Sequence, residues 1–229
     1  MALAHSPKII TDGLVLALDA GNTKSYPSSG TAWTDLSGNG NNGTLVNGVG
    51  YTSSNGGALT FDGSNDYVQL SIGNLWRSAA WSVNIWVYFD VISVTGFSDD
   101  RPLIHHGTAA TRQGLHLISR NGIIYFGMFG DDLFGPAISA NTWYNFVFTM
   151  NNSSYARQIY VNGTLTSSGT AGGPYVGGGS NTRMGGPVVG VMPQTYFDGR
   201  IPKLLLYNRV ITADEVLQNY NALKGRYTT

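Results

Sequence analysis

The segment that most restricts the fold of this chain lies near the C-terminus, where one strand leads into a short helix. Residues 201–207 are apolar apart from Pro202 and Lys203, a composition typical of a strand buried within a sheet. Thr212 and Glu215 then have the spacing of a capping box, in which each side chain bonds the backbone N–H of the other residue. Apolar residues follow at helical spacing. This is nearly the only helical pattern in the chain, so the rest is predicted to consist of strands and loops.

Short apolar or alternating segments, separated by turn residues, make up most of the chain. The clearest is residues 81–89, whose odd-numbered positions are all apolar and form one face of a strand. The pairs Asn121-Gly122 and Asn162-Gly163 predict tight hairpin turns. Further strands are expected at residues 13–20, 58–71 (two strands around a turn), 101–106, 114–120, 123–129, 142–150, 155–161, 164–166, near 183, and 201–207. Together these patterns predict an all-β protein, a two-sheet antiparallel sandwich with one short C-terminal helix.

One domain is predicted over residues 13–229, preceded by an N-terminal arm, residues 1–12. The arm shows no periodicity, and its few apolar residues suit an extended strap that helps to hold a partner. Residues 21–50 are rich in Gly, Asn, Ser and Thr and predict a long surface loop. We expect Trp33 and Leu36 to anchor this loop, because long loops without anchors are uncommon.

The charge of the chain is low and balanced. Charged residues make up 11% of the sequence, and 13 Lys and Arg balance 13 Asp and Glu. This balance argues against nucleic acid as a partner, and weak self-repulsion favours association with like subunits. The absence of cysteine favours assembly in a reducing cytoplasm over a disulfide-stapled secreted module. No signal-peptide pattern and no apolar run long enough for a bilayer are present, so no membrane partner is predicted.

Five motifs in order resemble the laminin-G-like domains of the concanavalin A-like lectin/glucanase superfamily. They are the strand pair Leu-Thr-Phe-Asp-Gly-Ser-Asn-Asp-Tyr-Val at 59–68, the central strand at 81–87, the Trp-initiated strand at 143–149, the hairpin Ile-Tyr-Val-Asn-Gly at 159–163, and the closing segment that begins Phe-Asp-Gly-Arg-Ile at 197–201. The resemblance covers about residues 57–224. It implies a concanavalin A-like jelly roll.

The N-terminal part resembles a narrower group. Residues 13–27 and 33–44 look like the lead-in of laminin-G-like proteins in tailed bacteriophages, cyanophages in particular. This resemblance implies a structural protein of a virion. Similar lead-ins also occur in bacterial surface proteins, so that alternative stays open.

Catalysis is not expected. Many proteins of the resembled superfamily cleave glycans with a pair of carboxylates, one acting as acid and one as nucleophile or base. This chain has a single glutamate, Glu215, which its helix cap already uses. The adjacent pairs Asp99-Asp100 and Asp131-Asp132 would point to opposite faces of an extended segment, and their neighbours are typical of solvated turns.

The histidines give no metal or catalytic pattern. His105 and His106 would face opposite sides of one strand, so they are not expected to share an ion. His116 lies on the polar face of the next strand. Ordinary strand histidines are the expectation.

Calcium is the best cofactor candidate in this sequence. Asp62, Asn65 and Asp66 share one turn, which Asp198 could approach from the closing strand, and relatives often bind calcium near such positions. Here the acidic positions of the family's Ile-Asp-Glu motif are Pro202 and Lys203. Turn caps without metal are the favoured interpretation, and any bound calcium is expected to be weak and structural.

Three aromatic residues are candidate ligand or interface residues. Trp86 and Tyr88 lie on the otherwise polar face of the central strand, and Tyr175 lies in a Gly-rich loop. Exposed aromatic rings beside polar groups suit stacking on sugars, and they equally suit contact with a neighbouring subunit.

Two functions are left open. The first is a non-enzymatic structural protein of a virion, a capsid decoration or tail-associated component, whose partners are other virion proteins or itself, with adhesion to cell-surface glycan as an added role. The second is a carbohydrate-binding adhesion module of a phage receptor-binding protein or a bacterial surface protein. The first predicts a virion assembled in the host cytoplasm, and the second an extracellular or cell-surface location.

Overall fold

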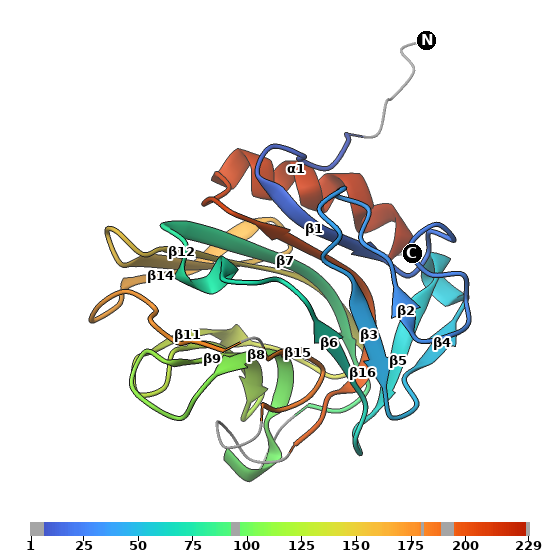
Figure 1. Ribbon diagram of the computed structural model, residues 1–229, viewed down its shortest axis with the longest axis horizontal. Helices are drawn as coiled ribbons and strands as arrows, with labels where there is room; N and C mark the ends of the chain where they lie inside the picture. Colours follow the sequence, from blue (N-terminus) through green and yellow to red (C-terminus); the bar gives the residue numbers. More distant parts are fainter. Residues whose placement is uncertain (1–6, 93–96, 180, 189–194, 228–229) are drawn as a thin grey trace.

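The protein folds as two antiparallel β-sheets packed face to face, with one helix against the outside of one sheet (Figure 1). This computed structural model describes residues 7–92, 97–179, 181–188 and 195–227. Sheet A has the strand order β14-β13-β12-β7-β16-β5-β4, with β1 paired to β16, and sheet B has the order β11-β10-β9-β8-β15-β6-β3-β2. The predicted two-sheet antiparallel sandwich with one short C-terminal helix is confirmed.

The strands of sheet A are β1 (Leu14–Asp19), β4 (Gly50–Thr52), β5 (Ala58–Asp62), β7 (Ala80–Phe89), β12 (Thr142–Asn151), β13 (Ala156–Val161), β14 (Thr164–Thr170) and β16 (Asp198–Tyr207). The strands of sheet B are β2 (Ala32–Trp33), β3 (Gly43–Val46), β6 (Tyr67–Leu70), β8 (Arg101–Gly107), β9 (Gly114–Arg120), β10 (Ile123–Gly127), β11 (Asp132–Ala137) and β15 (Thr182–Met184). The helix α1 spans Ala213–Leu223, and short 3₁₀ turns lie at Ser54–Gly56, Leu75–Arg77, Phe97–Asp99 and Lys224–Arg226. Within the described part of the chain, no helix combines the length and apolar character needed to cross a membrane.

The core lies between the two sheets, and β7 shows how the sequence builds it. Its odd-numbered residues, from Trp81 to Phe89, are fully buried and belong to the main apolar cluster, as their alternation predicted. β7 pairs with β12 on one side and with β16 on the other, so the strongest strand pattern in the sequence is also central in sheet A.

The predicted surface loop at residues 21–50 is partly wrong. It contains β2, β3 and the first residue of β4, because β3 pairs with β6 and β4 pairs with β5. These strands are too short and too rich in glycine to carry a strand pattern of their own, so pairing with distant strands forms them. Trp33 is fully buried, as expected of an anchor, whereas Leu36 is exposed.

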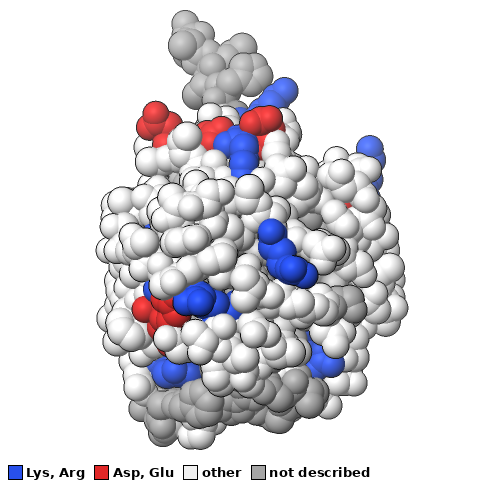
Figure 2. All heavy atoms as spheres, turned by 60° about the vertical axis from the view of Figure 1, so that its left-hand side comes forward, with Lys and Arg blue, Asp and Glu red and all other residues white. Residues whose placement is uncertain are grey.

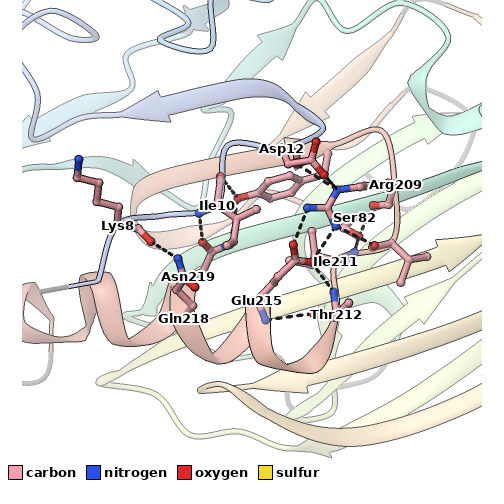
Figure 3. Close-up of polar contacts among 12 residues, drawn as sticks. Lys8, Ile10, Asp12, Ser82, Arg209, Ile211, Thr212, Glu215, Gln218 and Asn219 are labelled. Carbon is pink, nitrogen blue, oxygen red and sulfur yellow. Dashed lines mark hydrogen bonds and ion pairs between the residues drawn. The ribbon is translucent and has the colours of Figure 1, made fainter.

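The outer face of sheet A is covered by α1 and by residues 7–12 (Figure 3). The backbone N–H of Ile10 donates to Oδ1 of Asn219 on the helix at 2.8 Å, and the Tyr207 hydroxyl of β16 donates to the carbonyl of Ile10 at 3.1 Å. Ile9 and Ile10 pack against the apolar clusters beneath the helix. Residues 7–12 of the predicted arm therefore pack against the domain, whereas residues 1–6 lie outside the described residues.

Arg209 connects the N-terminal segment to the helix cap (Figure 3). Its guanidinium makes two bonds to the Glu215 carboxylate, of 2.8 and 2.7 Å, and its Nε lies 2.8 Å from Oδ2 of Asp12. The predicted capping box is present, since Glu215 N–H donates to the Thr212 hydroxyl and Thr212 N–H donates to Glu215. The bonds from Arg209 lower the pKa of Glu215 to about 2.

The Glu215→Gln substitution is expected to lower the free energy of unfolding at neutral pH by about 0.5–2 kcal/mol, because it removes a helix cap and its ion pair. The Glu215 pKa is about 2 when folded and near 4.5 when unfolded, so its stabilising effect is complete above pH 4.5 and is lost as the pH falls towards 2. Denaturant unfolding at several pH values should show the difference between wild type and variant shrinking across that range. The matched control is Asp214→Asn, a carboxylate of the same helical turn; an equal pH response in both variants would contradict the assignment.

Candidate functional site

Trp86 does not lie on an open face. It is 1% exposed, because Tyr220 of α1 stacks on it with ring centroids 5.7 Å apart and Tyr227 covers it at 4.5 Å. The strand pattern placed Trp86 on the correct side of β7, but the C-terminal residues of the chain itself cover that side. Its predicted exposure is wrong, and it offers no surface to a ligand.

A buried charge network holds the C-terminal turn over Trp86. Nζ of Lys203 lies 2.7 Å from Oδ2 of Asp19, and Arg226 makes further bonds of 3.0 to 3.2 Å to the same carboxylate. Burial alone would raise the pKa of Asp19, but the two cations outweigh it and lower the pKa. Lys203, which replaces an acidic residue of the family pattern, therefore has a structural partner on β1.

Tyr88 is half-buried, and its ring contacts two other side chains. The Arg200 guanidinium lies 4.5 Å from its ring centroid, and the Trp143 ring lies at 5.1 Å. Trp143 is the cross-strand partner of Tyr88 on the outer face of sheet A. The hydroxyl edge of Tyr88, near Oδ1 of Asn141, is the part that remains for another molecule, so its role as an interface residue stays a prediction.

Tyr175 is also buried, contrary to the expectation from its Gly-rich loop. It is 2% exposed, and its hydroxyl lies 2.7 Å from Nδ1 of His106 and 3.0 Å from the carbonyl of Gln113. Burial raises the pKa of Tyr175. The residue fastens its loop to β8 and is no candidate for stacking on a ligand.

Two of the four candidate calcium ligands, Asp62 and Asp66, already accept hydrogen bonds from backbone N–H groups. Oδ1 of Asp62 accepts from the N–H of Ser64, and Oδ2 of the buried Asp66 accepts from the N–H of Asp62. Burial and the neighbouring Asp62 raise the pKa of Asp66, while burial and Asp90 raise that of Asp198. Among the described residues, no three His, Cys, Asp or Glu side chains are grouped closely enough to hold a metal. These contacts are those of turn caps, and calcium binding here stays a prediction.

The outer face of sheet B carries a row of polar side chains, which we call the polar row. Its members are the cross-strand neighbours Gln69, Arg183, His105 and His116, and Asp132, which lies one strand further on across Gly127. His105 is fully buried, neither ring nitrogen has a hydrogen-bond partner, and burial lowers its pKa to about 3. His106 points to the opposite side of β8, as predicted.

Two acidic residues of this face are fixed by basic side chains. The Arg120 guanidinium makes two bonds to the fully buried Asp100, of 2.7 and 2.6 Å, so the expectation that Asp100 lies in a solvated turn is wrong. Nε2 of His116 lies 3.3 Å from Oδ1 of Asp132. The imidazole crosses Gly127, where a Cβ would come within 1.8 Å of Nε2, so glycine is required at this position.

Phe134 stands at the open end of the polar row, beside Asp132 on β11. It is 59% exposed, the highest value among the large apolar side chains that the structure describes, and its cross-strand partner Tyr125 meets it edge-on at 4.9 Å. The Arg120 guanidinium in turn lies 5.3 Å from the Tyr125 ring. Phe134 therefore presents a free aromatic surface next to side chains that are already held in place.

The sequence did not predict Phe134, because Gly135 and Pro136 interrupt the strand pattern of β11. A usable signal exists in the alternation of Asp132, Phe134 and Pro136 directly after the turn at Gly130. We name the surface formed by Phe134, Tyr125, Asp132, His116 and Arg120 the Phe134 site.

Removal of calcium is expected to leave the melting temperature almost unchanged, because the oxygens of Asp62 and Asp66 already cap backbone N–H groups. An ion bound only to the folded state would raise the melting temperature by mass action. Thermal unfolding with excess chelator and with millimolar calcium tests this, and Asp62→Asn serves as the site control. A melting temperature that drops with chelator and recovers with calcium, in wild type only, would show that the site was misjudged.

Comparison with known proteins places the chain in a superfamily. A family model described as the concanavalin A-like lectin/glucanases superfamily, laminin G type, matches residues 62–217. No curated protein sequence gives a significant match.

Several solved structures share the fold. Domain 4 of the extracellular GH43 arabinanase AbnA from Geobacillus stearothermophilus, in complex with arabinotriose, has a TM-score of 0.68 at 19% identity and covers 90% of this chain and 98% of that domain. Trypanosoma rangeli sialidase in complex with 2,3-difluorosialic acid has a TM-score of 0.68 at 17% identity, and the binding domain of botulinum neurotoxin DC in complex with SialylT has 0.70 at 12%. This chain spans 36% of the sialidase and 52% of the toxin domain, although 100% and 93% of its own length are covered.

These identities are low and establish the fold alone, whereas the family match covers more than half of the chain. The matched residues 62–217 include strands of both sheets and the start of the terminal helix α1. The chain belongs to the concanavalin A-like lectin/glucanases superfamily, in its laminin-G-like branch.

Proposed function

We propose that this chain is a non-enzymatic, lectin-like domain that binds carbohydrate at the Phe134 site. The observation that carries the proposal is the free ring of Phe134 beside fixed polar side chains. Ligand sites of this kind combine an apolar aromatic surface with a few positioned polar groups. The complexes of the arabinanase domain with arabinotriose and of the toxin domain with SialylT support carbohydrate as the ligand class.

Each part of the Phe134 site has a distinct role in this proposal. The ring of Phe134 stacks on the C–H face of a sugar, and Tyr125 supports the ring from the side. The Asp132 side chain, 22% exposed, accepts hydrogen bonds from sugar hydroxyls. His116 and Gly127 hold that carboxylate in position before the ligand arrives, which limits the entropy lost on binding.

The carboxylates support binding without hydrolysis. Glycosidases need two carboxyl groups, one on each side of the scissile bond, of which one must hold a proton. Glu215 is tied to Arg209 on the opposite side of the molecule, and Asp100 is tied to Arg120 by two bonds. Among the described residues, these two carboxyl groups are therefore already engaged by arginines.

The Phe134→Ala substitution is expected to weaken carbohydrate binding by about tenfold or more, because it removes the stacking surface. Titration calorimetry with arabinotriose and other oligosaccharides measures the change, and no reducing ends should appear during incubation. Leu165→Ala, which removes an exposed apolar side chain on β14, is the matched control and should bind like wild type. Unchanged binding in Phe134→Ala together with loss in Tyr88→Ala would move the site to sheet A.

A structural role in a virion is the second candidate function, and the surface charge favours it. Figure 2 shows a face on which charged side chains are sparse and acidic groups lie beside basic ones. Such a surface gives little repulsion between neighbouring subunits, which suits contact with other virion proteins or with copies of the chain itself. The phage-type lead-in at residues 13–44 agrees with this role and with a virion location. A free carbohydrate-binding module would instead work outside a cell or at its surface.

Self-association through the part of the outer face of sheet A around Tyr88 is the expected outcome of the structural role. An interface of about 800 Å² per partner is needed, and Tyr88, Trp143 and Arg200 would lie within it. Light scattering over a concentration series should show oligomers that Tyr88→Ala weakens and that the control Phe134→Ala, on the other sheet, leaves intact. A monomer at all concentrations, with no binding to assembled phage particles, would remove the structural role and leave the carbohydrate-binding module.

A further inference from the structure

The basic groups of the Phe134 site are already paired with carboxylates of the protein. Nε and Nη2 of Arg120 donate to the Asp100 carboxylate at 2.7 and 2.6 Å, and the guanidinium lies against the Tyr125 ring. The His116 imidazole lies between the Gly114 carbonyl, 3.0 Å from Nδ1, and Asp132, 3.3 Å from Nε2. An acidic ligand at Phe134 would have to compete with Asp100 for Arg120 and with Asp132 for His116.

The carboxylate of the site remains ionised. Burial would raise the pKa of Asp132, but the contact with His116 and the charge of Arg120 outweigh it, and the pKa is lowered. Asp132 is two residues from Phe134 on the same face of β11, and 22% of its side chain is exposed. A ligand stacked on Phe134 therefore lies next to a negative charge that can only accept hydrogen bonds.

We propose that the Phe134 site selects uncharged sugars and discriminates against sugars that carry a carboxylate or a sulfate; the inference rests on the proposed carbohydrate-binding function. A neutral sugar can give its hydroxyl hydrogens to Asp132 while its C–H face covers Phe134. An acidic group in the same place loses water, meets Asp132 at close range and gains no cation in return, because Arg120 and His116 already face carboxylates.

The discrimination between neutral and acidic sugars originates in charge, whereas stacking on Phe134 depends on shape and contributes equally to both kinds of sugar. Like charges at contact distance repel, and salt screens that repulsion over about 8 Å at physiological ionic strength. Binding of a neutral sugar should depend little on salt, whereas the penalty on an acidic sugar should fall as salt rises. The preference is thus measurable separately from the affinity.

Matched probes test the selectivity: galacto-oligosaccharides against oligogalacturonates of the same length, and lactose against sialyllactose. Titration calorimetry on the wild-type protein should give at least about tenfold tighter binding for the neutral member of each pair. The Asp132→Asn variant should narrow that ratio several-fold, while Asp214→Asn, which removes one negative charge at the start of α1, should keep it. The ratio in wild type should also narrow between low and high salt, a readout that does not depend on the folding of any variant.

Equal or tighter binding of the acidic members by the wild-type protein would overturn the selectivity and leave carbohydrate binding intact. The role of Asp132 would be overturned if the Asp132→Asn variant, shown by circular dichroism to be folded, kept the wild-type ratio of neutral to acidic sugar affinity. Absence of binding to every neutral and acidic probe would overturn the proposed function itself, and the selectivity with it.

Discussion

The ion network of Asp19, Lys203 and Arg226 connects three distant parts of the chain at one carboxylate. Asp19 ends β1, Lys203 lies in β16, and Arg226 belongs to the C-terminal turn. Breaking a buried ion pair by removing one partner costs about 3–5 kcal/mol, because the other charge is left without compensation. The position of the C-terminal turn, and with it the cover of Trp86 by Tyr227, depends on this contact.

The two sheets differ in what their outer faces require. A strand in a sandwich has one face in the core and one face outside, and in sheet A the outer face contains Trp86, Leu205 and Tyr207, so it must be covered. The chain covers it with its own ends, α1 and residues 7–12. In sheet B the outer face contains Arg120 and His116, which lie against the carboxylates of Asp100 and Asp132, and Phe134 on the same face is exposed. The candidate site therefore lies on the sheet that the terminal segments do not occupy.

Sequence reasoning predicted the parts of the fold that depend on local patterns. The alternation from Trp81 to Phe89 identified the central strand, and Thr212 with Glu215 identified the helix start, because both signals lie within a few neighbouring residues. The burial of Tyr175 could not be predicted in this way, since its hydroxyl binds His106 and Gln113, which are far away in the sequence. The bonds between Asp100 and Arg120 depend likewise on the register of β8 against β9.

The restriction to local patterns also explains why the sequence did not identify the candidate site. Strand periodicity placed Trp86 and Tyr88 on the outer face correctly, but it contains no information on which distant segment covers that face. Phe134 was missed because glycine and proline in β11 conceal a strand that forms by pairing with β10. The residues that a ligand would contact are therefore determined by which distant segments pack over each sheet and by the register of the strands. Neither can be deduced from local patterns in a single sequence.

The positions of Pro7 and Tyr227 also determine how the domain can be displayed. Both ends of the described chain lie on the outer side of sheet A, held there by α1 and by the Asp19 network, whereas Phe134 lies on the outer side of sheet B. Attachment to a particle, a second domain or a sensor chip through either end would direct the Phe134 surface away from the support. An array of such attached domains would present many copies of the Phe134 site in the same orientation. The effective affinity for a repetitive glycan would then depend on the distance between neighbouring copies.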